Sequence, residues 1–296
     1  MSEKIIAALD MGGTNIKGCL FRDDLTPAGA PIQTPVDSQG DSEHILSALA
    51  GTLVRLCADC GPARVARLCV STPGPFEYEP GRAKMTEKYG AIYAVPLREE
   101  FRRRVPLTDD VPICFLSDAN AFLLGEALCG AGRGCRDLAA VTLGTGLGYS
   151  VMKNGRVLTN ENGRPYDVPA VDSCNGGTLQ TFCSGRGLAA RCLAETGSVR
   201  TARQMAESAD PVSLKLFREM GFLLGSHLQP RLASLGIRRL IMGGQVSYAL
   251  PLFLDALSSS LPGVAVIRAE RPADAALCGA VAYGLGRTEP WQIVGV

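Results

Sequence analysis

The sequence predicts an α/β protein of about two domains, and three observations support this fold class. Segments with strand character alternate with segments of helical periodicity along the chain, an order typical of α/β folds. The 296 residues exceed the size of one typical domain. Two glycine-rich turns, at 11–14 and 144–148, each follow a strand-like apolar run, and two related lobes would produce this echo.

Composition and charge define the broad class of protein. Hydrophobic residues make up 46% of the chain and charged residues 20%, which supplies sizeable cores and excludes a disordered chain. The net charge of +1 gives no reason to expect nucleic acid or an anionic membrane as a partner. No apolar run approaches the roughly 18 residues of a membrane span, and no signal-peptide core follows the start. The 11 scattered cysteines are typical of reduced thiols, so we expect a cytoplasmic protein.

In the first half, apolar patterning predicts strands at 4–11, 16–21, 65–70 and 112–116. The first two form a hairpin because Gly12-Gly13 separates them. A capping residue, Asp41, opens an amphipathic helix that ends near Gly61. The prolines and the glycine of 71–75 are incompatible with helix and with a strand ladder, so we expect 72–95 to be mostly loop.

In the second half, the same patterning predicts a helix from Ser117-Asp118 onward, strands at 138–143, 149–152, 237–242 and 264–267, and helices at 185–195, 211–234 and 273–285. Glycines follow two of these strands, at 144–148 and at Gly243-Gly244. Strands that alternate with helices are again typical of an α/β fold.

The first glycine turn has the residue types of a phosphate site. Asp10 ends a strand, Gly12 and Gly13 can bring backbone N–H groups close to an anion, and Thr14 adds a hydroxyl donor. Such a loop fits a phosphate with its metal ion. An ordinary tight hairpin that needs glycine for positive φ is the alternative, and these residues alone do not separate the two.

The second glycine turn, Gly144-Thr145-Gly146-Leu147-Gly148, lies between two strand-like runs. A dinucleotide-binding fingerprint would open a helix here, so that interpretation is disfavoured. Two hairpin loops, each with a threonine, could instead hold the phosphates of one nucleotide from opposite sides. Gly243 and Gly244 would let a third backbone segment approach a base or ribose, with a plain strand-to-helix turn as the alternative.

Asp118 is the best candidate for a general base. A carboxylate can take the proton from an attacking hydroxyl, and Asp118 stands where a buried strand gives way to a helix. The alternative is that Ser117 or Asp118 only caps that helix, and local sequence favours this alternative.

Together, the two loops and Asp118 resemble the actin-like ATPase superfamily of sugar kinases, Hsp70 and actin, and within it the ROK family of bacterial sugar kinases. The resemblance covers almost the whole chain. It rests on the segments 10–17, 71–75, 116–121, 143–148, 242–244 and 279–280. Each motif alone is weak, but their order and spacing together match the family.

The resemblance implies a two-lobed actin-like (ribonuclease H-like) fold with a central cleft, in which the γ-phosphoryl group of ATP passes to a sugar hydroxyl. It implies that Asp118 is the general base and that Asp10 holds Mg²⁺ through water. It assigns ATP binding to Asp10, Gly12, Gly13, Thr14, Lys17, Gly144, Thr145, Gly146, Gly243 and Gly244, and sugar binding to Pro73, Gly74, Ser117, Glu161, Arg164 and Gln180. Phosphoryl transfer needs mainly positioning and charge neutralisation, so no covalent nucleophile is required.

The chain departs from the family at its zinc motif. Relatives usually carry Glu-x-Gly-His and then Cys-x-Cys-Gly-x-x-Gly-Cys-Leu-Glu, which bind a structural zinc and the sugar. Here Arg164 replaces the histidine, and Val171, Ser173 and Thr178 stand where three cysteines would be. Zinc needs thiolate or imidazole ligands, and Cys174 cannot hold it alone, so we predict no zinc site.

The sugar side is altered at three positions: Ser117 replaces Asn, Arg164 replaces His and Gln180 replaces Glu. An amide donates as well as accepts, and a guanidinium suits a carboxylate or phosphate. The hypothesis is that the acceptor is not plain glucose and carries an acidic or otherwise unusual substituent. The alternative is that Arg164 points away into a salt bridge.

We therefore predict an ATP- and Mg²⁺-dependent carbohydrate kinase that acts on a small-molecule sugar, and the resemblance allows a homodimer. The expected first lobe is 1–116 with the helix of 281–296 returning to it, and the second lobe is 117–280. A ROK-type repressor would need an N-terminal helix-turn-helix, for which Asp10 comes too early. A sugar-sensing protein without catalysis is the remaining alternative, favoured by the altered sugar residues and opposed by Asp118 and both loops.

Overall fold

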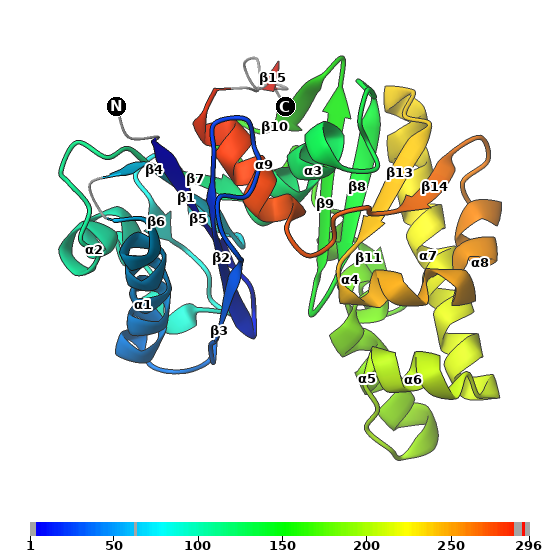
Figure 1. Cartoon of the computed structure of the whole chain (residues 1–296). Coiled ribbons are helices and arrows are strands. Elements are labelled where there is room, and N and C mark those ends of the chain that lie inside the picture. The colour runs from blue at the N-terminus through cyan, green and yellow to red at the C-terminus, as the bar shows by residue number, and fades with distance from the viewer. Residues whose placement is uncertain (1–3, 62–63, 287–291, 294–296) are drawn as a thin grey trace. The chain divides into compact units, whose positions relative to one another are not determined.

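The computed structural model describes residues 4–61, 64–286 and 292–293, and the chain divides into two compact units (Figure 1). The first unit comprises Met1–Cys129, Thr159–Arg164 and Ala273–Val296, and the second comprises Gly130–Leu158 and Pro165–Pro272. Each unit combines a sheet with helices, which confirms the predicted α/β fold class. The predicted lobe boundaries stay a prediction, and part of the segment predicted to return to the first lobe, 287–291 and 294–296, lies outside the described residues.

The sheet of the first unit has the strand order β3-β2-β1-β4-β7. Its strands are β1 (Ile5–Met11), β2 (Asn15–Phe21), β3 (Ile32–Pro35), β4 (Val65–Thr72) and β7 (Ile113–Ser117), and β15 (Gln292–Ile293) is a further short strand of the chain. The predicted hairpin of β1 and β2 is confirmed as an antiparallel pair, and β1, β4 and β7 are parallel. Because parallel strands end at the same edge, Asp10 lies beside Ser71, and Thr72 lies beside Ser117.

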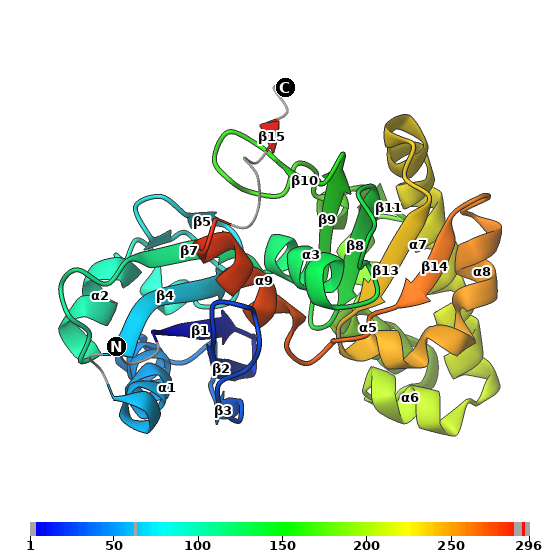
Figure 2. The same ribbon diagram turned by 45° about the horizontal axis from the view of Figure 1, so that its top comes forward.

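Helices cover both faces of this sheet, α1 (Ser42–Cys60) on one side and α9 (Ala275–Gly284) on the other (Figures 1 and 2). Leu9 of β1 packs into the core that α1 closes. Cys69 of β4 faces α9, since a Cβ placed on Gly284 would lie 2.4 Å from its Sγ. Burial on both faces explains why these strands are apolar at successive positions rather than at alternate ones. The predicted cap of α1 is also confirmed, because the Asp41 carboxylate accepts from the His44 N–H at 2.8 Å.

The helix α3 (Asp118–Cys129) packs tightly against α9. A Cβ on Gly125 would lie 1.9 Å from the Ala275 carbonyl oxygen, and one on Gly279 would lie 1.8 Å from the Ala121 carbonyl oxygen. Only glycine permits backbones to approach this closely. Since α9 also contacts β1, β4 and β7, this packing fixes the first turn of α3, and with it Asp118, relative to the sheet.

The segment between β4 and β7 is mostly irregular up to residue 95, as predicted, but its interior is well packed. It contains β5 (Phe76–Glu77), β6 (Arg82–Ala83), the short 3₁₀ helix η2 (Gly90–Ile92) and α2 (Leu97–Arg104). Phe76 and Tyr89 are fully buried in the core of the unit. Tertiary packing therefore defines this segment, which has no periodicity of its own.

The sheet of the second unit has the strand order β14-β13-β8-β9-β10. These strands are β8 (Leu138–Leu143), β9 (Leu147–Lys153), β10 (Arg156–Thr159), β13 (Arg239–Gly243) and β14 (Ala265–Arg268). β8 and β9 form an antiparallel hairpin across the second glycine turn, and β8, β13 and β14 are parallel. Gly243 pairs with Thr142, so the glycine pair after β13 lies next to the second glycine turn.

The other elements of the second unit are mainly helical: η3 (Pro169–Val171), β11 (Ser173–Cys174), β12 (Gly177–Thr178), α4 (Leu179–Phe182), α5 (Gly185–Thr196), α6 (Ala202–Ser208), α7 (Pro211–Leu235), η4 (Gln245–Leu252) and α8 (Leu254–Ser259). The helices predicted at 185–195 and 211–234 are confirmed as α5 and α7. α7 packs along α8 (Figure 2). Within the described residues, no helix has both the length and the apolar character needed to cross a membrane.

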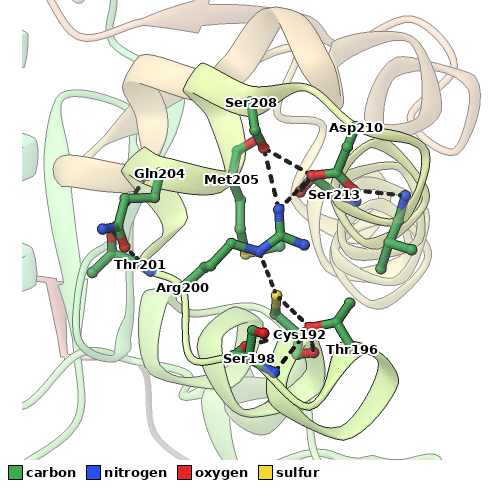
Figure 3. Close-up of polar contacts among 11 residues, drawn as sticks. Cys192, Thr196, Ser198, Arg200, Thr201, Gln204, Met205, Ser208, Asp210 and Ser213 are labelled. Atoms are coloured by element: carbon green, nitrogen blue, oxygen red, sulfur yellow. Dashed lines mark hydrogen bonds and ion pairs between the residues drawn. The ribbon is translucent and has the colours of Figure 1, made fainter.

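Arg200 ties together three helices of this unit (Figure 3). Its guanidinium binds the carboxylate of Asp210, which caps α7 by accepting from the Ser213 N–H at 3.1 Å. It also contacts Ser208 Oγ at the end of α6 at 3.4 Å and Cys192 Sγ of α5 at 3.3 Å. The ion pair and these hydrogen bonds hold the pKa of Asp210 well below its usual range and stabilise the corner of α5, α6 and α7.

Candidate functional site

The carboxylate of Asp10 stands at the edge of the first sheet where β1 ends. Its Oδ1 accepts a hydrogen bond from Ser71 Oγ at 2.7 Å. Burial raises the pKa of Asp10, and the Ser71 hydroxyl and the Lys17 charge oppose that rise. Lys17 pairs with Asp10 across the hairpin and donates from Nζ to the Ala273 carbonyl at 2.9 Å. Mg²⁺ binds through one or two carboxylates plus phosphate oxygens and water, and Asp10 meets that requirement.

The glycines of the first turn are needed for close approach and not for a left-handed backbone. Neither Gly12 nor Gly13 is among the glycines with positive φ in the described residues. A Cβ on Gly12 would lie 2.4 Å from the Asn15 carbonyl oxygen, and the Gly12 carbonyl accepts from Tyr89 Oη at 2.5 Å. The hydroxyl-bearing Thr14 is exposed at the tip. The positive-φ hairpin, the alternative interpretation of this sequence, therefore does not account for the glycines.

Asp118 is the first residue of α3 and follows directly on β7. Its carboxylate accepts from the adjacent Ala119 N–H at 2.8 Å. An N-cap side chain accepts from an N–H two or three residues further on, so this contact does not confirm the helix cap of the alternative interpretation. Burial, and then the charge of Asp10, raise the pKa of Asp118 to about 6, against the opposing effects of Lys88 and Ser117. A helix cap needs no such pKa, whereas a base that works near neutral pH does.

Three hydroxyl groups gather beside Asp118. Tyr78 and Thr72 are buried, and their hydroxyls have no hydrogen-bond partner of normal geometry among the described residues. Burial and the Asp118 charge raise the pKa of Tyr78, while the neighbouring Ser117 hydroxyl lowers it. Tyr78 Oη also lies 4.0 Å from where a Cβ on Gly74 would stand. The hydroxyls of Tyr78, Thr72 and Ser117 therefore neighbour one another beside Asp118, and each keeps hydrogen-bonding capacity for a polar ligand.

Arg164 lies in a turn that Asn160 closes through two hydrogen bonds to the Arg164 backbone. The Asn160 side chain accepts from the Arg164 N–H at 3.1 Å, and the Asn160 N–H donates to the Arg164 carbonyl at 3.0 Å. The guanidinium acts electrostatically on Tyr78, and its Nε is buried without a hydrogen-bond partner in the described part of the chain. Glu161 is exposed and lines, with Tyr78 and Asn160, a small cavity of about 140 Å³. Residues 159–164 therefore stand next to the hydroxyls beside Asp118.

Lys88 is a residue of this region that the sequence did not single out. A Cβ on Gly13 would lie 3.4 Å from Lys88 Cε and 3.6 Å from its Nζ. The Lys88 charge also lowers the pKa of Asp118. No periodicity or motif points to this lysine, since it lies in the segment expected to be loop.

The second glycine turn is held in place by the two helices that follow it in the second unit. The Gly185 N–H donates to the Gly144 carbonyl at 2.7 Å. Gln180 Oε1 accepts from the Leu147 N–H at 3.1 Å and lies 2.6 Å from where a Cβ on Gly146 would stand. A Cβ on Gly144 would meet nothing within 4 Å, so protein packing does not explain this glycine. Gln180, predicted to bind sugar, therefore supports the backbone of the second glycine turn.

The glycines after β13 border the second turn. Gly244 has a φ of +78°, and a Cβ there would lie 2.4 Å from the Leu143 carbonyl oxygen. Ser247 Oγ donates to the Gly244 carbonyl at 2.7 Å. Thr145 is exposed at the tip of the turn. The second unit thus brings Gly144, Thr145, Gly146, Gly243 and Gly244 together, as the sequence predicted.

In the second unit, the segment around the positions where zinc ligands would stand is held by a polar network of neighbouring residues. Val171 and Ser173 are exposed, and Ser173 pairs with Thr178 in a short hairpin. Arg231 of α7 binds two carboxylates of this loop, with Nε 2.6 Å from Asp167 and Nη2 2.9 Å from Asp172. Within the described residues, no group of three or more His, Cys, Asp or Glu side chains is placed to hold a metal ion.

The sequence matches known proteins along most of its length. A profile described as "ROK family" matches residues 6–280. A glucokinase of Halalkalibacterium halodurans is 24% identical over 302 residues, which cover 90% of this chain and 88% of that protein. The bifunctional enzyme NanE/NanK of Brucella melitensis is 25% identical over 93% of this chain, and the match spans 52% of that longer protein.

Solved structures share the fold. The ROK family glucokinase from Streptomyces griseus, in complex with glucose and AMPPNP, superimposes with a TM-score of 0.77 at 23% identity, covering 95% of this chain and 99% of that one. The ROK hexokinase from Thermus thermophilus gives a TM-score of 0.75 at 23% identity, with 96% and 99% covered. These likenesses confirm the actin-like ATPase fold that the sequence predicted. Because the family profile spans nearly the entire sequence, from β1 to α9, the chain belongs to the ROK family.

Proposed function

We propose that the protein is an ATP- and Mg²⁺-dependent carbohydrate kinase, with Asp118 as the general base. The observation that carries the proposal is the position of Asp118 at the end of β7, with a pKa of about 6 and the hydroxyl groups of Tyr78 and Ser117 beside it. Its carboxylate is largely ionised at neutral pH and can accept the proton of a bound hydroxyl. The glucokinase and hexokinase relatives support the same activity class.

The two glycine turns fit phosphate groups, each within its own unit. The first combines the Asp10 carboxylate with glycines whose side-chain positions are closed by backbone or by Lys88. The second leaves open space above Gly144 and an exposed hydroxyl on Thr145. Backbone amides of such turns, with a hydroxyl donor, suit phosphate oxygens. When bound, Mg²⁺-ATP would supply the phosphoryl group and neutralise the charge that develops on it.

The residues of the first unit orient the acceptor. Tyr78, Thr72 and Ser117 offer hydroxyl donors and acceptors beside Asp118, which suits the alternating hydroxyls of a sugar. Asp118 takes the proton from the attacking hydroxyl, and its hydrogen bond from Ala119 holds the carboxylate in position. No side chain forms a covalent bond to the phosphoryl group in this scheme.

Arg164 supports an acceptor with an acidic substituent. Its Nε is buried without a hydrogen-bond partner, and no carboxylate of the described residues pairs with its guanidinium within 4.0 Å. This argues against the alternative in which Arg164 turns away into a salt bridge. An unpaired guanidinium near the acceptor hydroxyls would match a carboxylate or phosphate.

The test is ADP release over a panel of neutral hexoses, N-acetylated amino sugars and sugar acids, with Asp118→Asn as the control. We expect turnover with at least one sugar, a loss of about 10²-fold to 10⁴-fold in Asp118→Asn, and a preference for a sugar acid that Arg164→His removes. Equal rates with glucose and every other sugar would contradict the acidic acceptor.

The sensing protein is the other outcome of this test. Measurable sugar binding without turnover of any sugar would identify a catalytically inactive sensor instead of a kinase. A cytoplasmic location and a homodimer also stay predictions, to be checked by fractionation and by the mass of the purified protein in solution.

A further inference from the structure

The backbone around Lys88 is anchored on both sides. The Glu87 carbonyl accepts from Gln39 Nε2 at 2.5 Å. The Tyr89 N–H donates to the Ser38 carbonyl at 2.7 Å, and its buried hydroxyl donates to the Gly12 carbonyl at 2.5 Å. Two of these hydrogen bonds tie the segment to Ser38 and Gln39, and the third ties it to the first glycine turn, so the Lys88 side chain leaves a defined point of the backbone.

The Lys88 ammonium lies between two predicted parts of the site. Its Nζ is 3.6 Å from where a Cβ on Gly13 would stand, and its charge acts on the Asp118 carboxylate. The side chain is partly buried, and among the described residues no carboxylate lies within the 4.0 Å of an ion pair. Lys84, four residues earlier, does have such a partner in Glu77 at 3.4 Å. Anion binding beside an ammonium that is partly desolvated and has no protein counter-ion is favourable, because the anion supplies the missing charge partner.

We propose that Lys88 is a catalytic residue whose ammonium binds the transferred phosphoryl group between Gly13 and Asp118. This inference rests on the proposed kinase function and adds a residue to it. Asp10 and Asp118 both repel an incoming phosphate, and Lys88 offsets that repulsion at the place where charge develops. Asp118 accepts the acceptor's proton as the acceptor oxygen bonds to phosphorus and the bond from phosphorus to the leaving ADP oxygen breaks. Lys88 stays protonated throughout and transfers no proton.

The experiment compares Lys88→Met with Lys88→Arg and with the matched control Lys84→Met, all in the full chain with thermal unfolding as a check of folding. We expect Lys88→Met to lower kcat by about 10²-fold to 10³-fold, as loss of one charge-stabilising donor does, with the sugar KM changed less than threefold. Lys88→Arg should recover part of the loss, and Lys84→Met should keep the original kcat.

A second readout needs no turnover. If Lys88 contacts the γ-phosphoryl group, Lys88→Met should bind a non-hydrolysable ATP analogue about tenfold more weakly while its affinity for ADP stays the same. The pH profile supplies a third, since the groups that face Asp118 are Asp10, Lys88, Ser117 and Tyr78. Without the Lys88 charge, the acidic limb of kcat should move to higher pH.

Each outcome separates the two proposals. If the unaltered protein turns over a sugar and Lys88→Met keeps kcat within threefold at the alkaline plateau, the role of Lys88 is refuted and the kinase function stands. If the unaltered protein turns over no sugar, the kinase function fails. Selective loss of analogue binding would then still support the phosphate contact, and equal affinities of both proteins for the analogue would refute it.

Discussion

Replacing Asp118 with asparagine should stabilise the fold while it removes catalysis. Burial and the charge of Asp10 raise the pKa of Asp118 from 3.8 to about 6, so ionisation of this carboxyl costs more in the folded chain than in the unfolded chain. Asparagine resembles the protonated acid and can still accept from the Ala119 N–H. Asp118→Asn therefore relieves the ionisation cost without removing this hydrogen bond.

The magnitude follows from the difference between the folded and unfolded pKa values. A pKa that is raised on folding lowers stability as the pH rises from the unfolded value, 3.8, through the folded value, about 6. A tenfold change in the acid dissociation constant corresponds to about 1.4 kcal/mol, so above pH 7 the full cost is about 3 kcal/mol. At pH 5 only about half of that cost applies, and it vanishes below about pH 3. Asp118→Asn should thus gain about 3 kcal/mol at pH 8 and about half as much at pH 5.

The assay is urea unfolding of both proteins at pH 8 and pH 5, with thermal unfolding beside it. A gain of about 3 kcal/mol corresponds to roughly 6 to 12 °C in Tm for a chain of this size. The matched control is Asp23→Asn, because Asp23 is exposed in the turn after β2 and its replacement should leave both quantities unchanged. An equal or lower stability of Asp118→Asn at pH 8, or a gain that does not shrink at pH 5, would refute the reasoning.

Three more predictions concern other parts of the molecule. The kcat of the unaltered protein should fall below an apparent pKa of about 6, because the base must be ionised; a flat pH–rate profile between 5 and 8 would contradict this. Gly279→Ala should cost about 3 kcal/mol or more in urea unfolding, since its Cβ would meet a backbone oxygen at 1.8 Å, whereas Gly51→Ala on the open face of α1 should gain about 0.5 to 1 kcal/mol. Arg231→Ala should lower stability by about 2 kcal/mol, and a zinc chelator should leave the Tm of the unaltered protein the same; a fall in Tm with the chelator would show that a metal is present after all.

Apolar periodicity predicted the regular helices and strands but missed an edge strand of the first sheet. The β1–β2 hairpin, α1 and α7 have strong apolar patterns, so their existence and type were readable. β3 (Ile32–Pro35) was missed because it is an edge strand that follows a turn rich in proline and glycine. Edge strands tolerate proline and need little apolar surface, so they lack the apolar pattern by which a strand is recognised in a sequence.

The residues of the candidate site also fall into those that the sequence identified and those that it missed. Asp10 and Asp118 were identified because each stands where an apolar strand ends, a position that sequence reveals. Lys88 and Tyr78 were not, because they lie in an irregular segment whose conformation depends on distant contacts, such as the hydrogen bond from Tyr89 to Gly12. Such contacts are set by the tertiary fold, and nothing in the local pattern around residues 72–95 encodes them.

A charged network holds the loop at the position of the family's zinc motif. Asp172 binds both Arg231 and His227 of α7, the latter at 3.1 Å, and its carbonyl accepts from the Leu179 N–H at 2.8 Å. Leu179 begins α4, whose next residue, Gln180, supports the second glycine turn. Because these contacts form a continuous path, the network supports the second glycine turn as well as its own loop. The side chains of Arg231, Asp167 and Asp172 are only about one quarter exposed. Solvent therefore screens the attraction between the guanidinium and the two carboxylates only in part.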